Sequence, residues 1–176
     1  MIIPAHILVD TLPAADEKEL LRKGLAVEAA IRAYTNNNFQ NRDVRAWGYT
    51  VEGIRGGIMV ELEHVKLGDN IQLSESVNNG VYTIADFAPN DVIVVNAELY
   101  TEQTCLVTRV DYPADVQEGA LNLIKWDMEN RDKVGVKSES LSRKSTTYYD
   151  MDATNSLMGY PASLIGFLKP YIKARF

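Results

Sequence analysis

The stretch NIQLSESVNNGVYTIADF, residues 70–87, decides the fold of the central part of this chain. Its two ends are rich in apolar and β-branched residues, and along 81–87 the side chains alternate with the period of a strand. Between the ends lie Asn78, Asn79 and Gly80, residue types that accept the backbone conformations of a tight turn. The stretch therefore predicts a β-hairpin.

Strand patterns continue on both sides of this hairpin. The run Val92-Ile93-Val94-Val95 is apolar throughout, which is typical of a strand that is covered on both faces. Six of the 11 glycines fall between Gly48 and Gly80, where tight turns would use them. The predicted strands are 45–51, 57–63, 70–74, 81–87, 92–97 and 105–110. We therefore predict a small all-β module, either a barrel or a sandwich.

Two amphipathic helices flank this β region. The first is predicted over 13–34, with Asp16 and Glu19 as a capping box and Thr11 as a rival cap. The second begins at Pro113, because proline suits the first turn of a helix, and ends near 131–133. The apolar faces are Leu20, Gly24, Val27, Ile31 and Tyr34 in the first helix and Val116, Ala120, Leu123 and Ile124 in the second. We expect the two helices to pack together.

Two further segments follow. Residues 138–149 are polar and have the composition of a loop or an edge strand. A last helix is predicted from 160, with Pro170 expected to kink or end it. One face of it carries Leu164, Phe167, Leu168 and Tyr171. Each segment has two interpretations. The polar one is either a solvated loop or an arm along a neighbouring subunit, and 160–176 either docks on the chain's own helices or inserts into a partner.

These patterns predict an α+β fold class. A small helical bundle, formed by 1–43 and 113–176, is expected to be the core and to end in a C-terminal helical arm. The all-β module, barrel- or sandwich-like, is expected over 44–112 as an insert that folds semi-independently.

The amino-acid composition disfavours several classes of function. Lys and Arg total 18 against 24 Asp and Glu, a net charge of −6, whereas a chain that binds mainly nucleic-acid phosphate is normally basic. His6 and His64 lie far apart in the chain, and the single Cys105 sits in an apolar run where we expect it to be buried and inert. We predict no enzymatic activity, no catalytic or metal site and no cofactor.

No apolar run approaches the ~20 residues of a membrane span. The apolar segment 1–9 lacks the basic region and the cleavage site of a signal peptide. We therefore expect no membrane contact.

Three stretches resemble a known family. They are AAIRAYTN (29–36), VKSESLSR with STTY (136–143 and 145–148), and YPASLI with LKPY and RF (160–165, 168–171 and 175–176). Together and in this order they resemble the head–tail connector proteins, also called adaptor or head-completion proteins, of siphophages and related prophages. The resemblance covers roughly 13–41 and 113–176, about half of the chain. Simple members of the family join their helices by a short loop, whereas here the β module intervenes.

The resemblance implies a structural virion protein of the head–tail neck, assembled in the host cytoplasm. It implies a homo-oligomeric ring, usually of twelve copies, that joins the portal protein to a stopper or tail-completion protein and lets DNA pass through its channel. The residues implied to bind the portal are Tyr160, Leu164, Phe167, Leu168, Lys169, Tyr171, Lys173, Arg175 and Phe176. The residues expected to form the inter-subunit arm are Ser138, Glu139, Leu141, Arg143, Lys144 and Tyr148.

Two alternatives remain open. The chain is either another neck or tail-completion protein, or a small-barrel binding module that grips a sugar or nucleic acid through Trp47, Tyr49 and Tyr82. The size of the assembly in solution distinguishes these classes, because we expect a neck subunit to form a large ring and a binding module to be a monomer.

Overall fold

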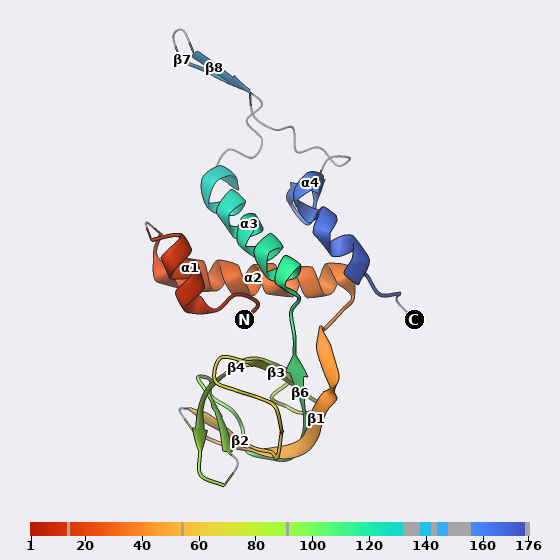
Figure 1. Cartoon of the computed structure of the whole chain (residues 1–176). Coiled ribbons are helices and arrows are strands. Elements are labelled where there is room, and N and C mark those ends of the chain that lie inside the picture. Colours follow the sequence, from red (N-terminus) through yellow and green to blue (C-terminus); the bar gives the residue numbers. More distant parts are fainter. Residues whose placement is uncertain are drawn as a thin grey trace. The chain divides into compact units, whose positions relative to one another are not determined.

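A computed structural model of the chain describes residues 1–13, 15–53, 55–90, 92–131, 138–141, 144–147 and 156–174. The chain divides into two compact units (Figure 1). One contains Met1 and Asn38–Tyr112 and is built of strands, and the other contains Ile2–Asn37 and Pro113–Phe176 and is built mostly of helices. The helical unit is thus assembled from sequence on both sides of the strand unit.

The strand unit is a closed antiparallel barrel. Its strands are β1 (Gln40–Val51), β2 (Gly56–Met59), β3 (Asn70–Ser74), β4 (Gly80–Ala88), β5 (Val92–Val95) and β6 (Glu102–Val110). The order around the barrel is β1-β2-β5-β4-β3-β6, and pairing of β6 with β1 closes it. Each strand overlaps a predicted segment, although β1 begins before its predicted segment and β2 ends earlier than predicted. The predicted hairpin is also confirmed, with Leu73 opposite Gly80.

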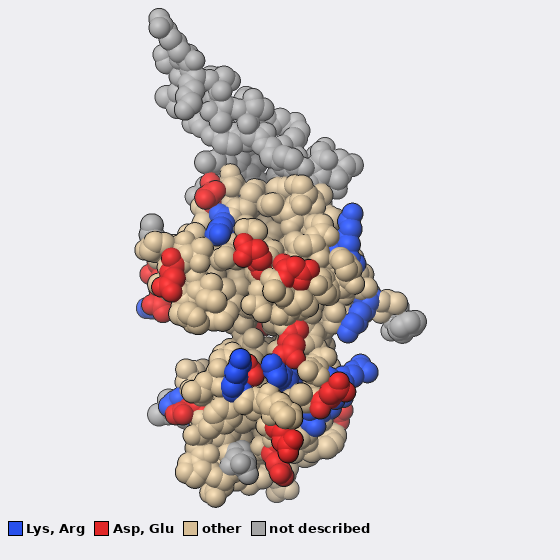
Figure 2. Space-filling model, viewed as in Figure 1, with Lys and Arg blue, Asp and Glu red and all other residues tan. Residues whose placement is uncertain are grey.

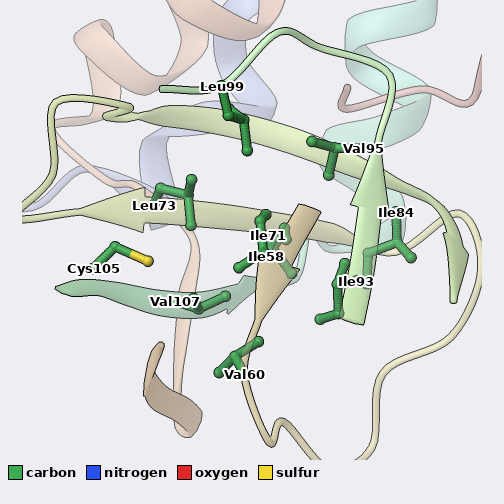
Figure 3. Packing of buried hydrophobic residues seen from close by; sticks show 10 residues of the cluster. All are labelled: Ile58, Val60, Ile71, Leu73, Ile84, Ile93, Val95, Leu99, Cys105 and Val107. Carbon is green, nitrogen blue, oxygen red and sulfur yellow. The ribbon is translucent and has the colours of Figure 1, made fainter. Parts of the chain in front are cut away.

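Alternate side chains of these strands point into the barrel and form its core (Figure 3). The buried apolar residues are Ile58, Val60, Ile71, Leu73, Ile84, Ile93, Val95, Leu99, Cys105 and Val107. A Cβ at Gly48 in β1 would lie 2.5 Å from the carbonyl oxygen of Met59, so the close approach of β1 to β2 requires glycine there. Burying each large apolar side chain contributes about 1.5–3 kcal/mol, so the barrel has a stabilising core of its own.

The helical unit contains α1 (Ala5–Thr11), α2 (Glu17–Thr35), α3 (Ala114–Asn130), α4 (Ala162–Ile165) and the 3-10 helix η2 (Gly166–Tyr171). The Asp16 carboxylate accepts a hydrogen bond of 3.0 Å from the backbone N–H of Glu19, which confirms the predicted cap of α2. Asn36 ends that helix in the left-handed conformation, with φ of 48°. The start of α3 after Pro113 also agrees with the prediction.

The helices bury the predicted faces against one another. Helix α2 packs on α3, and η2 contacts both. The buried apolar residues of the two long helices include Leu20, Val27 and Ile31 in α2 and Val116, Ala120, Leu123 and Ile124 in α3. Two small antiparallel pairs complete the unit: β7 (Ser138–Leu141) with β8 (Lys144–Thr147), and β9 (Ser156–Leu157) with β10 (Tyr160–Pro161).

The predicted fold class is wrong in its organisation. The chain has both helices and strands, but it is a closed six-stranded antiparallel barrel with four short helices, not a helical-bundle core that carries an accessory β module. Among the residues that the structure describes, only α2 and α3 are α-helices longer than two turns, and a bundle needs more long helices than these to enclose a core. The predicted C-terminal helical arm is likewise one turn of α-helix followed by η2, which packs against α2 and α3.

Candidate functional site

The C-terminal segment 160–174 lies on the chain's own helices. Leu168 is 0% exposed and Ile165 is 1% exposed. The backbone N–H of Lys173 donates to the carbonyl oxygen of Thr35 at 2.8 Å. The side-chain amide of Asn36 donates to the carbonyl oxygen of Ala174 at 2.9 Å. Apolar burial and hydrogen bonds therefore fix this segment at the C-terminal end of α2.

Two aromatic residues tie the same segment to the start of α3. The Tyr171 hydroxyl lies 2.8 and 2.9 Å from the two carboxylate oxygens of Asp115, to which it donates. This hydrogen bond is the main cause that raises the pKa of Tyr171, because it favours the protonated phenol. The ring of Phe167 covers Gly119, where an added Cβ would lie 2.3 Å from the ring. Only a glycine leaves room for that ring.

A charged cluster holds the beginning of the segment. The buried Asp127 of α3 forms ion pairs with Lys23 of α2 and with Arg131. The Arg131 guanidinium lies 4.9 Å from the ring centre of Tyr160 and 5.4 Å from that of Trp126, a cation–π arrangement. Burial, and secondarily the charge of Asp127, raise the pKa of Tyr160. The charged groups of this cluster pair with one another, so the cluster stabilises the helical unit.

The residues predicted to bind the portal are therefore not equally accessible. Tyr160 and Leu168 are buried inside the helical unit. The half-buried members are Leu164, Phe167 and Tyr171, and the exposed ones are Lys169 and Lys173. Arg175 and Phe176 lie outside the described residues. Ile172, which the sequence patterns did not single out, is 48% exposed between the two lysines.

The predicted inter-subunit arm is a two-stranded ribbon where the structure describes it. Ser138, Glu139 and Leu141 belong to β7 and Lys144 to β8, with Leu141 opposite Lys144 across the pair. Arg143 and Tyr148 lie outside the described residues. An arm that contacts a neighbouring subunit stays a prediction.

The aromatic residues of the barrel do not form one surface. Trp47 is 59% exposed and Tyr49 is 42% exposed, and their spacing of two along β1 places both on its outer face. Tyr82 of β4 is half-buried, and its hydroxyl donates to the carbonyl oxygen of Asn78 at 2.9 Å. Burial raises the pKa of Tyr82. Of the three residues predicted to grip a ligand, Trp47 and Tyr49 are therefore exposed on the same face.

Two adjoining hollows of about 270 and 300 Å³ open on the barrel and share the residues 61–63. The first has an apolar floor of Val60, Phe87 and Ile93. The second is lined by Asp43, Val44, Arg45, Glu61, Leu62, Glu63 and His64. Among the described residues no group of three or more His, Cys, Asp or Glu is arranged to hold a metal ion.

Cys105 is fully buried inside the barrel, as predicted. Burial is the main cause that raises the pKa of its thiol, and the charge of Glu102 adds to it. Cys105 packs with the apolar side chains of the barrel core.

Charge is unevenly divided between the two units. Residues 38–112 contain 11 acidic residues against 5 basic ones, which accounts for the whole net charge of −6. The helical unit is balanced, and on the face seen in Figure 2 it shows side chains of both signs. An acidic barrel disfavours anionic ligands such as nucleic acid.

Sequence reasoning missed one buried polar residue in the barrel. The Asn78 side-chain amide donates to the Thr50 hydroxyl at 3.0 Å and to the carbonyl oxygen of Tyr100 at 2.9 Å. Its carbonyl oxygen accepts from the backbone N–H of Tyr100 at 2.8 Å. The sequence pattern predicts that Asn78 lies at the hairpin, but it cannot predict hydrogen-bond partners more than twenty positions away.

Among the described residues, no helix combines the length and the apolar character that crossing a bilayer demands. A scan against models of known protein families finds no match to this chain, and a search of curated proteins finds no relative.

Proposed function

We propose that this protein is a structural subunit of a tailed-phage particle, forming a ring at the neck between the portal and the stopper or tail. The proposal starts from the resemblance of 29–36, 136–148 and 160–176 to head–tail connector proteins. One observation carries it further. The first and last of these stretches, far apart in sequence, meet in one unit through the hydrogen bonds of Lys173 with Thr35 and of Asn36 with Ala174.

The partner surface in this proposal is narrower than the resemblance alone implies. Tyr160 and Leu168 hold the segment on its own helices, because their side chains are buried there. Lys169, Ile172 and Lys173 are exposed, and in the proposal these three contact the portal. Their chemistry, an apolar side chain between two cations, suits an acidic rim around an apolar pocket.

Assembly into a ring would make binding to the portal strong even if the contacts of each subunit are weak. Once one subunit is bound, its neighbours bind their own sites at a high effective concentration. In the proposal, the β7–β8 ribbon supplies contacts between adjacent subunits, and the exposed basic residues of the C-terminal segment face the portal.

The test uses charge reversal at the exposed lysines. The variant Lys169→Glu/Lys173→Glu should fail to join portal-bearing heads, with a melting temperature close to that of the original chain. The control is Lys18→Glu, at another exposed lysine near the start of α2, and this variant should join heads normally. Heads that carry the double variant at the normal level would refute this surface. Purified particles that lack the chain altogether would refute the neck assignment.

A second candidate is a carbohydrate-binding module that uses the barrel. The observation in its favour is the pair of exposed aromatic side chains, Trp47 and Tyr49, on one face of β1. Light scattering of the full chain separates the candidates, because a monomer favours the module and a large ring favours the neck subunit. If Trp47→Ala left binding across a panel of polysaccharides unchanged, this candidate would be excluded.

A further inference from the structure

One end of the barrel carries the loops that follow β1, β3 and β5, described at 52–53, 55, 75–79 and 96–101. The chain enters and leaves the barrel at the other end, since β1 begins and β6 ends there. We call the end with these three loops the barrel tip.

The tip exposes apolar side chains that a folded chain usually buries. Tyr100 is 72% exposed, Val77 is 71% exposed and Val51 is 42% exposed. None of the three contributes to the barrel core. Large exposed apolar side chains at one end of a barrel are a mark of a contact site.

Hydrogen bonds tie the loops of the tip together. The Asn78 side chain hydrogen-bonds both the N–H and the carbonyl of Tyr100, which joins the loop 75–79 to the loop 96–101. The carboxylate of Glu102 accepts from the Ser76 hydroxyl and from the backbone N–H of Val77 at 3.1 Å. Because these bonds already hold the backbone of Val77 and Tyr100, a partner would lose little free energy in ordering the two loops.

The rim of the tip is acidic. Glu52, Glu75 and Glu98 are exposed, one in each loop. Arg55 is the basic residue of these loops, and its guanidinium donates to the side-chain oxygen of Asn96 at 3.2 Å. Apolar side chains within a rim of charge are the usual arrangement of a protein interface.

From this arrangement we propose that the barrel tip docks a positively charged surface of another protein, with Tyr100 and Val77 seated in an apolar depression of that partner. A second copy bound tip to tip would oppose the same three carboxylates to one another. Nucleic acid and anionic lipid would meet the same repulsion. A basic protein surface satisfies both the apolar centre and the acidic rim.

The test uses two synthetic hexapeptides as probes and does not depend on the neck assignment. One alternates arginine with leucine and phenylalanine, and the other has glutamate in place of every arginine. Each is titrated into the full isotope-labelled chain, and backbone amide shifts are followed by NMR. The arginine peptide should shift the amides of 75–79 and 96–101 and bind at least about ten-fold more tightly than the glutamate peptide.

The variant Val77→Ser/Tyr100→Ser should weaken binding of the arginine peptide about ten-fold or more. Its matched control is Leu67→Ser, because Leu67 is an equally apolar, 59% exposed residue at the other end of the barrel, and this variant should bind as the original chain does. Equal binding of the two peptides, shifts that map away from the tip, or no shifts at all would overturn the proposal. So would unchanged binding by the double variant. Melting curves confirm that the variants are folded, which is expected because highly exposed side chains contribute little to stability.

Discussion

The substitution Leu168→Ala tests whether the C-terminal segment belongs to the folded unit. Leu168 lies in η2, is 0% exposed, and sits in an element that contacts both α2 and α3. Alanine removes the buried side chain without changing charge or backbone hydrogen bonding. The loss of stability therefore reports the packing of this segment alone.

The expected loss is about 2–5 kcal/mol, the usual cost of replacing a fully buried leucine by alanine. Single domains are stable by about 5–15 kcal/mol, so this is a large fraction of the total. Truncation after Asn155 goes further, because it removes the buried Tyr160, Ile165 and Leu168 together. At about 1.5–3 kcal/mol for each side chain, that loss is about 5–9 kcal/mol and should unfold the helical unit.

Urea denaturation, followed by the helical circular dichroism signal, measures the difference. Lys169→Ala is the matched control, since the neighbouring lysine is exposed and should change stability by less than about 0.5 kcal/mol. If Leu168→Ala were as stable as Lys169→Ala, the segment would not be docked in solution. The interpretation as a free arm that inserts into a partner would then be favoured again.

Four other outcomes are expected. Asn78→Ala should cost about 2–4 kcal/mol in urea denaturation, because it leaves buried backbone groups without partners; a cost below about 1 kcal/mol would contradict the role of this amide. Gly119→Ala should lower the melting temperature although alanine favours helices, because its methyl group displaces the Phe167 ring; a higher melting temperature would show that the ring moves freely. Cys105 should react with a thiol reagent only as fast as the barrel opens, and rapid labelling of the native chain would contradict its burial. Because burial raises the pKa of Tyr160 in the folded state, its contribution to stability is complete below pH 10 and should fall above it; a flat pH titration of the unfolding free energy there would refute this.

The sequence alone determined the local elements of this protein. The barrel strands follow from alternation and β-branched runs, and Asn78-Asn79-Gly80 indicates the hairpin. Its loop, however, is 75–79, with Glu75 in the left-handed conformation and Gly80 already in β4. The start of α2 follows from the Asp16 cap. These features are local because hydrogen bonding and side-chain direction within a few residues fix them. Helix α1 escaped prediction because its seven residues are too few for a periodic signal.

Only the tertiary structure decided how these elements are organised. Strand periodicity does not say that β6 returns to β1, so it cannot distinguish a closed barrel from a sandwich. The pattern predicts a β module that folds semi-independently, but it does not show that this module is a complete closed barrel, so the prediction of a helical-bundle core is wrong. The apolar face of 160–171 was read correctly as a face, but whether it covers α2 and α3 or a partner depends on contacts more than a hundred positions apart. The free energy of such long-range contacts arises only when the chain is folded, and no short window of sequence contains it.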